Sequence, residues 1–129
     1  MLKTKKPIKK EFEEEFTTEE NLNHHYDKHV KDNKEYKWTK EEYDRYSDIL
    51  SKTPCDYKKI FGYVQRDRRD GKESYVKYDK ELELFIAYFM TKSRGPLIIT
   101  AYKKDWRKFN SDMYADEIYE YIGEIPKGL

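Results

Sequence analysis

Two histidines and a lysine lie within about one helical turn near the start of the chain. His25, Lys28 and His29 are separated by three and four residues, so on a helix they project from one side. Neighbouring positive charges disfavour each other, so the group would hold a neutral imidazole and a cation together near pH 7. Acid–base cleavage of a phosphodiester needs that pairing. We therefore predict that all three residues are catalytic.

Two other interpretations of these residues stay open. Histidines four residues apart can bind a metal, but the HExxH pattern needs Glu at position 26, where this chain has Tyr26. Lys28 on the same face would also oppose a bound cation, so we expect neither a metal nor a cofactor. The three side chains could instead be the plain surface of a charged helix.

The composition favours a single folded domain. The chain has 129 residues, of which 36% are hydrophobic and 16% aromatic, and disordered chains lack so many bulky core residues. Cys55 is the single cysteine, which excludes an internal disulfide and favours a cytoplasmic location. No apolar run reaches the roughly 18 residues of a membrane span, so we expect no membrane anchor.

The charge is uneven along the chain. Residues 51–110 contain 15 lysines and arginines against 8 acidic residues, whereas residues 111–129 contain 1 against 5. A local positive excess attracts polyanions, although a solvated lysine-rich surface would have the same composition. The predicted RNA contacts are Arg66, Arg68, Arg69, Tyr102 and Lys103.

Local patterns place these residues on an α+β fold. Residues 1–16 are expected to be a charged tail or linker, and 17–129 a single domain. Capping-box spacings at Thr17–Glu20 and Thr39–Glu42 predict helices over about 18–31 and 40–52.

The second half of the chain has the pattern of strands. Asp70 and Gly71 form a hairpin turn between strands within 58–67 and 72–79, and two apolar strands follow within 81–90 and 96–102. The apolar periodicity of 111–122 predicts a C-terminal helix. We expect N-terminal helices packed on a four-stranded antiparallel sheet, with the third and fourth strands central or well covered.

Several short motifs together resemble a known superfamily. They are His25-Tyr26-Asp27-Lys28-His29, Trp38-Thr39, Asp70-Gly71, Tyr78-Asp79 and the stretch from Gly95 to Thr100-Ala101-Tyr102. This pattern is similar to the superfamily of barnase, EndoU, colicin and RelE-like nucleases, and particularly to toxin domains of bacterial polymorphic, contact-dependent and phage-borne systems. Those domains carry an H-[FY]-x-K-H motif on an N-terminal helix and a late strand ending in G-x-[IVL]-x-T. Here the spacing from Gly95 to Thr100 is longer, and Val30 stands where Gly is common.

The resemblance implies roles for individual residues. His25 or His29 would be the general base or acid, Lys28 an electrostatic partner, and Thr100 a hydroxyl contact to the phosphate. Independently of the resemblance, we expect Arg94 to hold a phosphate through two hydrogen bonds at the mouth of the cleft.

The resulting expectation is a metal-independent ribonuclease of toxin or mobile-element type. It would cleave RNA by attack of the 2′-hydroxyl, leave a 2′,3′-cyclic phosphate, and have an acidic immunity or antitoxin protein as partner. The alternative is a non-catalytic module of the same fold that binds nucleic acid or protein.

Overall fold

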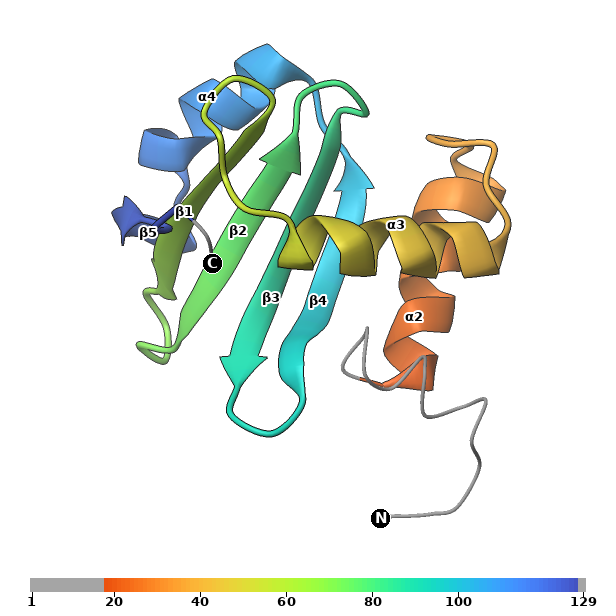
Figure 1. Cartoon of the computed structure of the whole chain (residues 1–129), viewed down its shortest axis with the longest axis horizontal. Helices are drawn as coiled ribbons and strands as arrows, with labels where there is room; N and C mark the ends of the chain where they lie inside the picture. The colour runs from red at the N-terminus through yellow and green to blue at the C-terminus, as the bar shows by residue number, and fades with distance from the viewer. Residues whose placement is uncertain (1–17, 128–129) are drawn as a thin grey trace.

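A computed structural model describes residues 18–127 of the chain, so the predicted tail over 1–16 and Thr17 lie outside the described residues. Helices and strands follow each other as an α+β arrangement, as predicted (Figure 1). In chain order they are α2 (Glu19–Tyr26), the π-helical turn η1 (Asp27–Asp32), α3 (Lys40–Lys52), β1 (Ile60–Asp67), β2 (Glu73–Asp79), β3 (Leu84–Thr91), β4 (Gly95–Lys103), α4 (Trp106–Ala115) and β5 (Tyr119–Glu124). No helix in this part of the chain is long and apolar enough to span a membrane.

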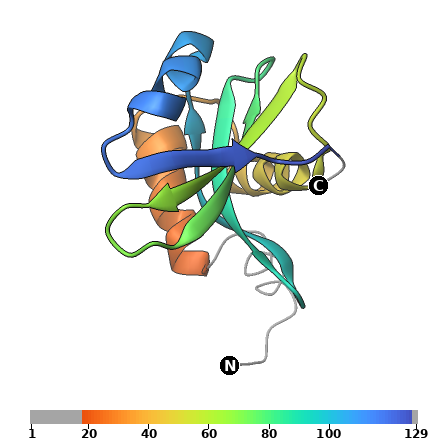
Figure 2. The same ribbon diagram turned by 90° about the vertical axis from the view of Figure 1, so that its left-hand side faces the viewer.

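Over residues 18–127 the sheet has five antiparallel strands in the order β4-β3-β2-β1-β5, one more than predicted. The helix predicted over 111–122 is present only as far as Ala115, and Tyr119–Glu124 forms β5 instead. Helix α4 begins earlier, at the N-cap Asp105, and ends at Ala115. Asp116 then turns the chain, because its Oδ1 accepts the backbone N–H groups of Ile118 and Tyr119, both at 2.7 Å. Figure 2, which faces this edge, shows α4 leading into β5.

Side-chain caps fix where the N-terminal helices begin. The Thr18 hydroxyl accepts the backbone N–H of Asn21 at 2.9 Å and starts α2. Thr39 and Glu42 form the predicted capping box with bonds of 3.1 and 2.9 Å, and α3 has the predicted bounds. The first helix departs from the prediction after Tyr26, where it widens into η1.

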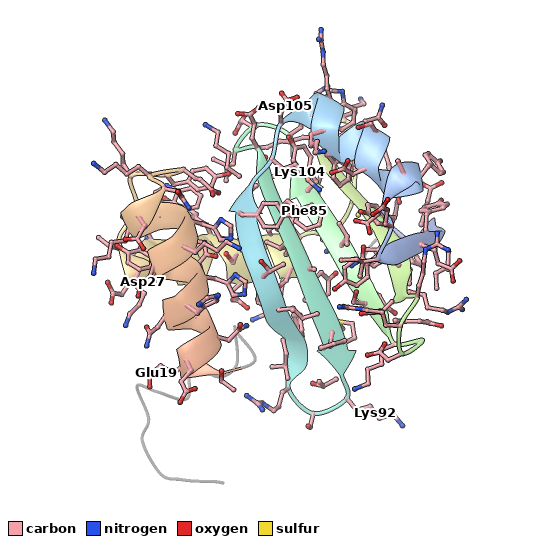
Figure 3. The ribbon with its side chains drawn as sticks, turned by 180° about the vertical axis from the view of Figure 1, so that it is seen from behind. Glu19, Asp27, Phe85, Lys92, Lys104 and Asp105 are labelled. Carbon is pink, nitrogen blue, oxygen red and sulfur yellow. The ribbon has the colours of Figure 1, made fainter. Side chains whose placement is uncertain are left out.

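The sheet is covered on both faces. Helix α3 crosses one face, here called the α3 face, where Tyr43 and Leu50 pack against Ile86 (Figure 1). Helix α4 packs on the opposite face, here called the α4 face, where Phe109 stacks on Tyr78 with ring centroids 4.4 Å apart. Figure 3 looks onto the α4 face.

A buried lysine closes the end of α3. Lys77 of β2 is fully buried on the α3 face, and its Nζ donates to the carbonyl groups of Ser51, at 3.0 Å, and Thr53. These carbonyls belong to the last turn and C-cap of α3, where backbone carbonyls have no donor within the helix. Burial lowers the pKa of Lys77 below its usual value.

Strand β4 lies at the edge of the sheet, where side chains of the N-terminal region cover its outer rim. Asn21 Nδ2 donates to the carbonyl of Ile99 at 2.8 Å, and the Tyr43 hydroxyl donates to that of Ala101. The backbone N–H of Lys103 donates to Glu35 Oε1 at 2.8 Å. These bonds occupy edge groups that would otherwise be open to another strand. They also fix α2 beside β4, as Figures 1 and 3 show.

Candidate active site

Two of the predicted catalytic residues, His25 on α2 and Thr100 on β4, meet where the helix lies against the strand. His25 Nδ1 is 3.2 Å from Thr100 Oγ1, although the two residues are 75 positions apart in the chain. A threonine hydroxyl can donate to a bare ring nitrogen or accept from a protonated one. One hydrogen bond therefore joins the ring nitrogen of His25 and the hydroxyl of Thr100, between helix and sheet.

Three aromatic rings form a stack that leads from α2 to β4. The His25 and His29 rings are nearly parallel, with an interplanar angle of 6° and centroids 5.8 Å apart. The His29 ring in turn stacks on Tyr102 at 5.2 Å. The π-helical turn η1 contains His29, and such turns are frequent at functional sites because they redirect side chains. Burial raises the pKa of Tyr102 to about 12, so its hydroxyl stays protonated.

A glutamate that the sequence analysis missed orients His29. Glu35 Oε2 lies 2.7 Å from His29 Nδ1, and the backbone N–H of Glu35 donates to the His29 carbonyl at 2.9 Å. A carboxylate can only accept a hydrogen bond, so Nδ1 of His29 carries a proton. The other ring nitrogen, Nε2, is left to exchange a proton with a substrate. Lys34 adopts the left-handed region, with a φ of 53°, immediately before Glu35. This uncommon conformation belongs to the turn that brings Glu35 back to the histidine.

The environment keeps His25 neutral. Its pKa falls from 6.5 to about 4, mainly because burial removes water from the ring, and further because His29, His24 and Lys28 add positive charge nearby. The sequence spacing predicted the effect of the neighbouring cations. Burial, which is the largest cause, depends on packing against β4 and was not visible in the sequence.

A cavity of about 100 Å³ opens beside Thr100 and Tyr102 on the α4 face. Gln65 and Ser74 lie on its sheet side, with Gln65 Nε2 donating to Ser74 Oγ at 3.0 Å. Lys104 brings a positive charge to its wall (Figure 3), where its Nζ lies 4.3 Å from the centre of the Phe85 ring.

Two acidic side chains of the α4 region complete this wall. Asp112 holds Lys104 through an ion pair of 3.2 Å, and Asp116 also lines the cavity. The cavity thus offers amide, hydroxyl and ammonium groups beside the histidine stack. Lys104 is a second functional candidate that sequence reasoning missed.

The other predicted catalytic cations differ in position. Lys28 has an exposed side chain on η1, close enough to His25 to help lower its pKa. Arg94 lies in the β3–β4 turn, where its backbone N–H donates to Thr91 Oγ1 at 3.0 Å. It is six residues from Thr100 along an extended strand, or about 20 Å at the usual rise per residue. The structure does not bring Arg94 to the histidine cluster.

Three of the predicted RNA contacts instead form ion pairs around the β1–β2 hairpin. Arg66 and Arg68 both contact Glu120, at 3.5 and 3.8 Å, and Arg69 contacts Asp67 at 2.8 Å. Alternation along β1 also turns Arg66 toward the α3 face, away from Thr100. The sequence showed the number of positive charges but not their pairing.

Of the predicted RNA contacts on β4, only one faces the site. Tyr102 belongs to the ring stack, whereas the neighbouring Lys103 points to the other face, where its Nζ is 3.8 Å from Glu83 and 5.9 Å from the Tyr36 ring. The residues that the structure does bring together are His25, His29, Thr100 and Tyr102, with Lys28 nearby.

Comparison with protein-family models, curated proteins and solved structures gave no match. The chemistry of the site is therefore argued from its geometry. Within residues 18–127, no three His, Cys, Asp or Glu side chains are grouped so as to hold a metal ion. A neutral imidazole beside a hydroxyl, and a second imidazole held by a carboxylate, form a pair able to take up and release protons.

Proposed function

We propose that the chain is a metal-independent endoribonuclease related to the barnase, EndoU, colicin and RelE-like superfamily. The observation that carries this proposal is the 3.2 Å contact between His25 Nδ1 and Thr100 Oγ1, made by an imidazole whose pKa is lowered to about 4. A base that is neutral at pH 7 can accept a proton there, and the adjoining cavity supplies polar groups for a phosphate.

In the proposed reaction, His25 takes the proton from a ribose 2′-hydroxyl. The resulting oxygen attacks the adjacent phosphorus, and the bond from phosphorus to the 5′-oxygen breaks. Protonated His29 gives its proton to that leaving oxygen. The products are a 2′,3′-cyclic phosphate and a 5′-hydroxyl, so DNA, which lacks the nucleophile, is not a substrate.

The remaining residues stabilise the negative charge on the phosphate or orient His29. Thr100 donates a hydrogen bond to a phosphate oxygen, and Lys28 supplies positive charge as negative charge develops. Lys104 can add to this charge only by leaving its 3.2 Å ion pair with Asp112. Glu35 is a positioning residue, because it holds His29 at 2.7 Å and compensates the charge of the doubly protonated ring.

Cleavage of single-stranded RNA in the presence of EDTA tests the proposal. The purified chain should produce ends with a 2′,3′-cyclic phosphate, identified by mass spectrometry, and His25→Gln should slow cleavage by about 10²- to 10⁴-fold. Glu20→Gln is the matched control, because Glu20 is an exposed residue of the same helix and is not among the groups that shift the pKa of His25.

Two results would count against this function. Full activity in His25→Gln would remove the proposed base. RNA that is retained by the wild-type chain but never cut would show the non-catalytic binding module.

A further inference from the structure

A second and larger cavity lies on the α4 face, between α4 and strands β1 and β5. Its volume is about 330 Å³, within the range of small-ligand pockets. Aromatic side chains dominate the lining, among them Phe61, Tyr63, Trp106, Tyr114 and Tyr121. The Phe61 and Trp106 rings lie 4.7 Å apart, and those of Tyr114 and Tyr121 lie 5.3 Å apart.

Polar and cationic groups accompany these rings. The Asn110 amide and the Glu124 carboxylate contribute to the lining and can bond to the N–H and carbonyl edges of a planar ring. The ammonium group of Lys80 lies 4.5 Å from the centre of the Trp106 ring, and that of Lys127 lies 5.5 Å from the Tyr57 ring. Aromatic faces flanked by lysines suit an unpaired nucleobase whose phosphates stay at the rim.

The larger cavity lies on the same face of the sheet as the candidate active site and shares one lining residue with the cavity beside it. Tyr63 of β1 lines both cavities, and Thr100 lies on β4, three strand intervals away. At the usual spacing, three intervals are about 14 Å. A base held in the larger cavity therefore belongs to a nucleotide outside the cleaved linkage.

We propose that the larger cavity is a base-binding subsite for the single-stranded RNA whose cleavage is proposed above. One unstacked base occupies the cavity against the faces of the lining rings, and Lys80 and Lys127 contact the adjoining phosphates. The inference rests on the proposed function for its choice of ligand. It adds that the substrate is unpaired and longer than a dinucleotide.

Tryptophan fluorescence tests binding to this cavity directly. The chain has two tryptophans, and Trp38 stacks on Tyr36 at 3.8 Å on the α3 side, so Trp38→Phe leaves Trp106 as the reporter. With His25→Gln added to keep the RNA intact, an adenosine hexanucleotide should quench Trp106.

Removing one ring of the cavity should weaken this binding. Tyr114 is 72% exposed, so Tyr114→Ala should leave the fold intact while reducing hexanucleotide affinity about 5- to 100-fold, the effect of losing one stacked base. Ile49→Ala is the matched control, because Ile49 is 52% exposed and belongs to α3 on the other side of the sheet. Circular dichroism of both variants verifies their fold.

Kinetics then separate the subsite from the catalytic centre. In the chain with His25 intact, Tyr114→Ala should lower kcat/KM for the hexanucleotide at least about 5-fold. It should leave kcat/KM for a dinucleotide unchanged, because a dinucleotide at Thr100 does not reach the larger cavity.

The outcomes distinguish the two proposals. Cleavage of RNA without any quenching of Trp106 overturns the subsite and leaves the ribonuclease standing. Quenching that depends on Tyr114, without cleavage by the wild-type chain, supports base binding and overturns the ribonuclease. Quenching by a proline-rich peptide but not by the hexanucleotide would show a protein-binding groove and overturn the subsite.

Discussion

Acidification from pH 7 toward pH 4 should destabilise the fold through His25. The pKa of this ring is about 4 in the folded chain, against 6.5 for an ordinary histidine. Between these values the unfolded chain binds a proton at His25 that the folded chain does not. Unfolding therefore takes up a proton, and the free energy of unfolding falls as the pH falls through this window. Below about pH 4 both states are protonated and the loss is complete.

The size of this effect follows from the shift. A fall in pKa of about 2.5 corresponds to about 3.5 kcal/mol, at about 1.4 kcal/mol for each pH unit. The ring is only partly buried, so solvent screening reduces the expected loss to about 1–2 kcal/mol. Single domains have a total stability of about 5–15 kcal/mol, so a loss of this size is measurable.

Urea unfolding at several pH values between 4 and 7 measures the loss. The His25→Gln variant should show a pH dependence that is flatter than the wild-type one by about 1–2 kcal/mol. His24→Gln should flatten it much less, because it removes only one of the smaller causes of the lowered pKa of His25. Ring titration by NMR gives the pKa of His25 independently. In the proposed ribonuclease reaction, kcat/KM should fall on acidification only as the pH approaches 4.

A titration of the His25 ring near pH 6.5 would refute this reasoning. Such a value would mean that burial and the neighbouring cations do not lower the pKa of the ring, and the predicted loss of stability between pH 7 and pH 4 would be absent. The proposed role of His25 as the base would be unaffected, because a ring with a pKa near 6.5 is also mostly neutral at pH 7.

Three further predictions concern contacts around the site and the fold. Glu35→Gln should slow RNA cleavage at least about 10-fold, because an amide no longer fixes the proton on His29 Nδ1. The control Glu41→Gln changes an exposed residue and should cleave at the wild-type rate. Equal cleavage rates for Glu35→Gln and the wild type would exclude the positioning role. Lys77→Ala should cost about 3 kcal/mol in urea unfolding, because one buried and one partly buried carbonyl lose their donor and the side chain no longer packs. Lys77→Met should restore only the packing, and a loss below about 1 kcal/mol for Lys77→Ala would contradict this account. Thr39→Ala should cost about 1 kcal/mol and Thr39→Ser much less, and equal thermal melts of the two variants would argue against the cap.

The elements with local signals could be predicted from the sequence. The capping box of Thr39 and Glu42 gave the start of α3, and Asp70-Gly71 gave the first hairpin, in which Gly71 adopts a φ of 76°. Both signals depend on groups close together in the chain, so no tertiary information is needed.

Strand β5 could not be predicted in this way. Tyr119 and Tyr121 alternate as a strand requires, but Ile118, Tyr121 and Ile122 also fit the period of a helix. Pairing with β1 decides between the two, and Gln65 and Tyr121, which face each other there, are far apart in the sequence. A long-range contact of this kind leaves no local pattern.

The residues of the candidate site likewise fall into those that the sequence predicted and those that it did not. The helical spacing of His25 and His29 predicted their common face, and the motif resemblance suggested Thr100. Glu35 and Lys104 were missed because their roles depend on a loop turn and on packing between distant segments. The arginines of the first hairpin were assigned to RNA because a count of charges does not show which carboxylates neutralise them.

The covered rim of β4 limits how copies of this protein could join through their sheets. Asn21, Tyr43 and Glu35 already bond to the backbone of Ile99, Ala101 and Lys103, so an incoming strand cannot form a continuous ladder along that part of β4. Among residues 18–127, β5 lies at the other end of the sheet and pairs with β1. Joining of two copies through strand pairing is therefore hindered at the β4 edge.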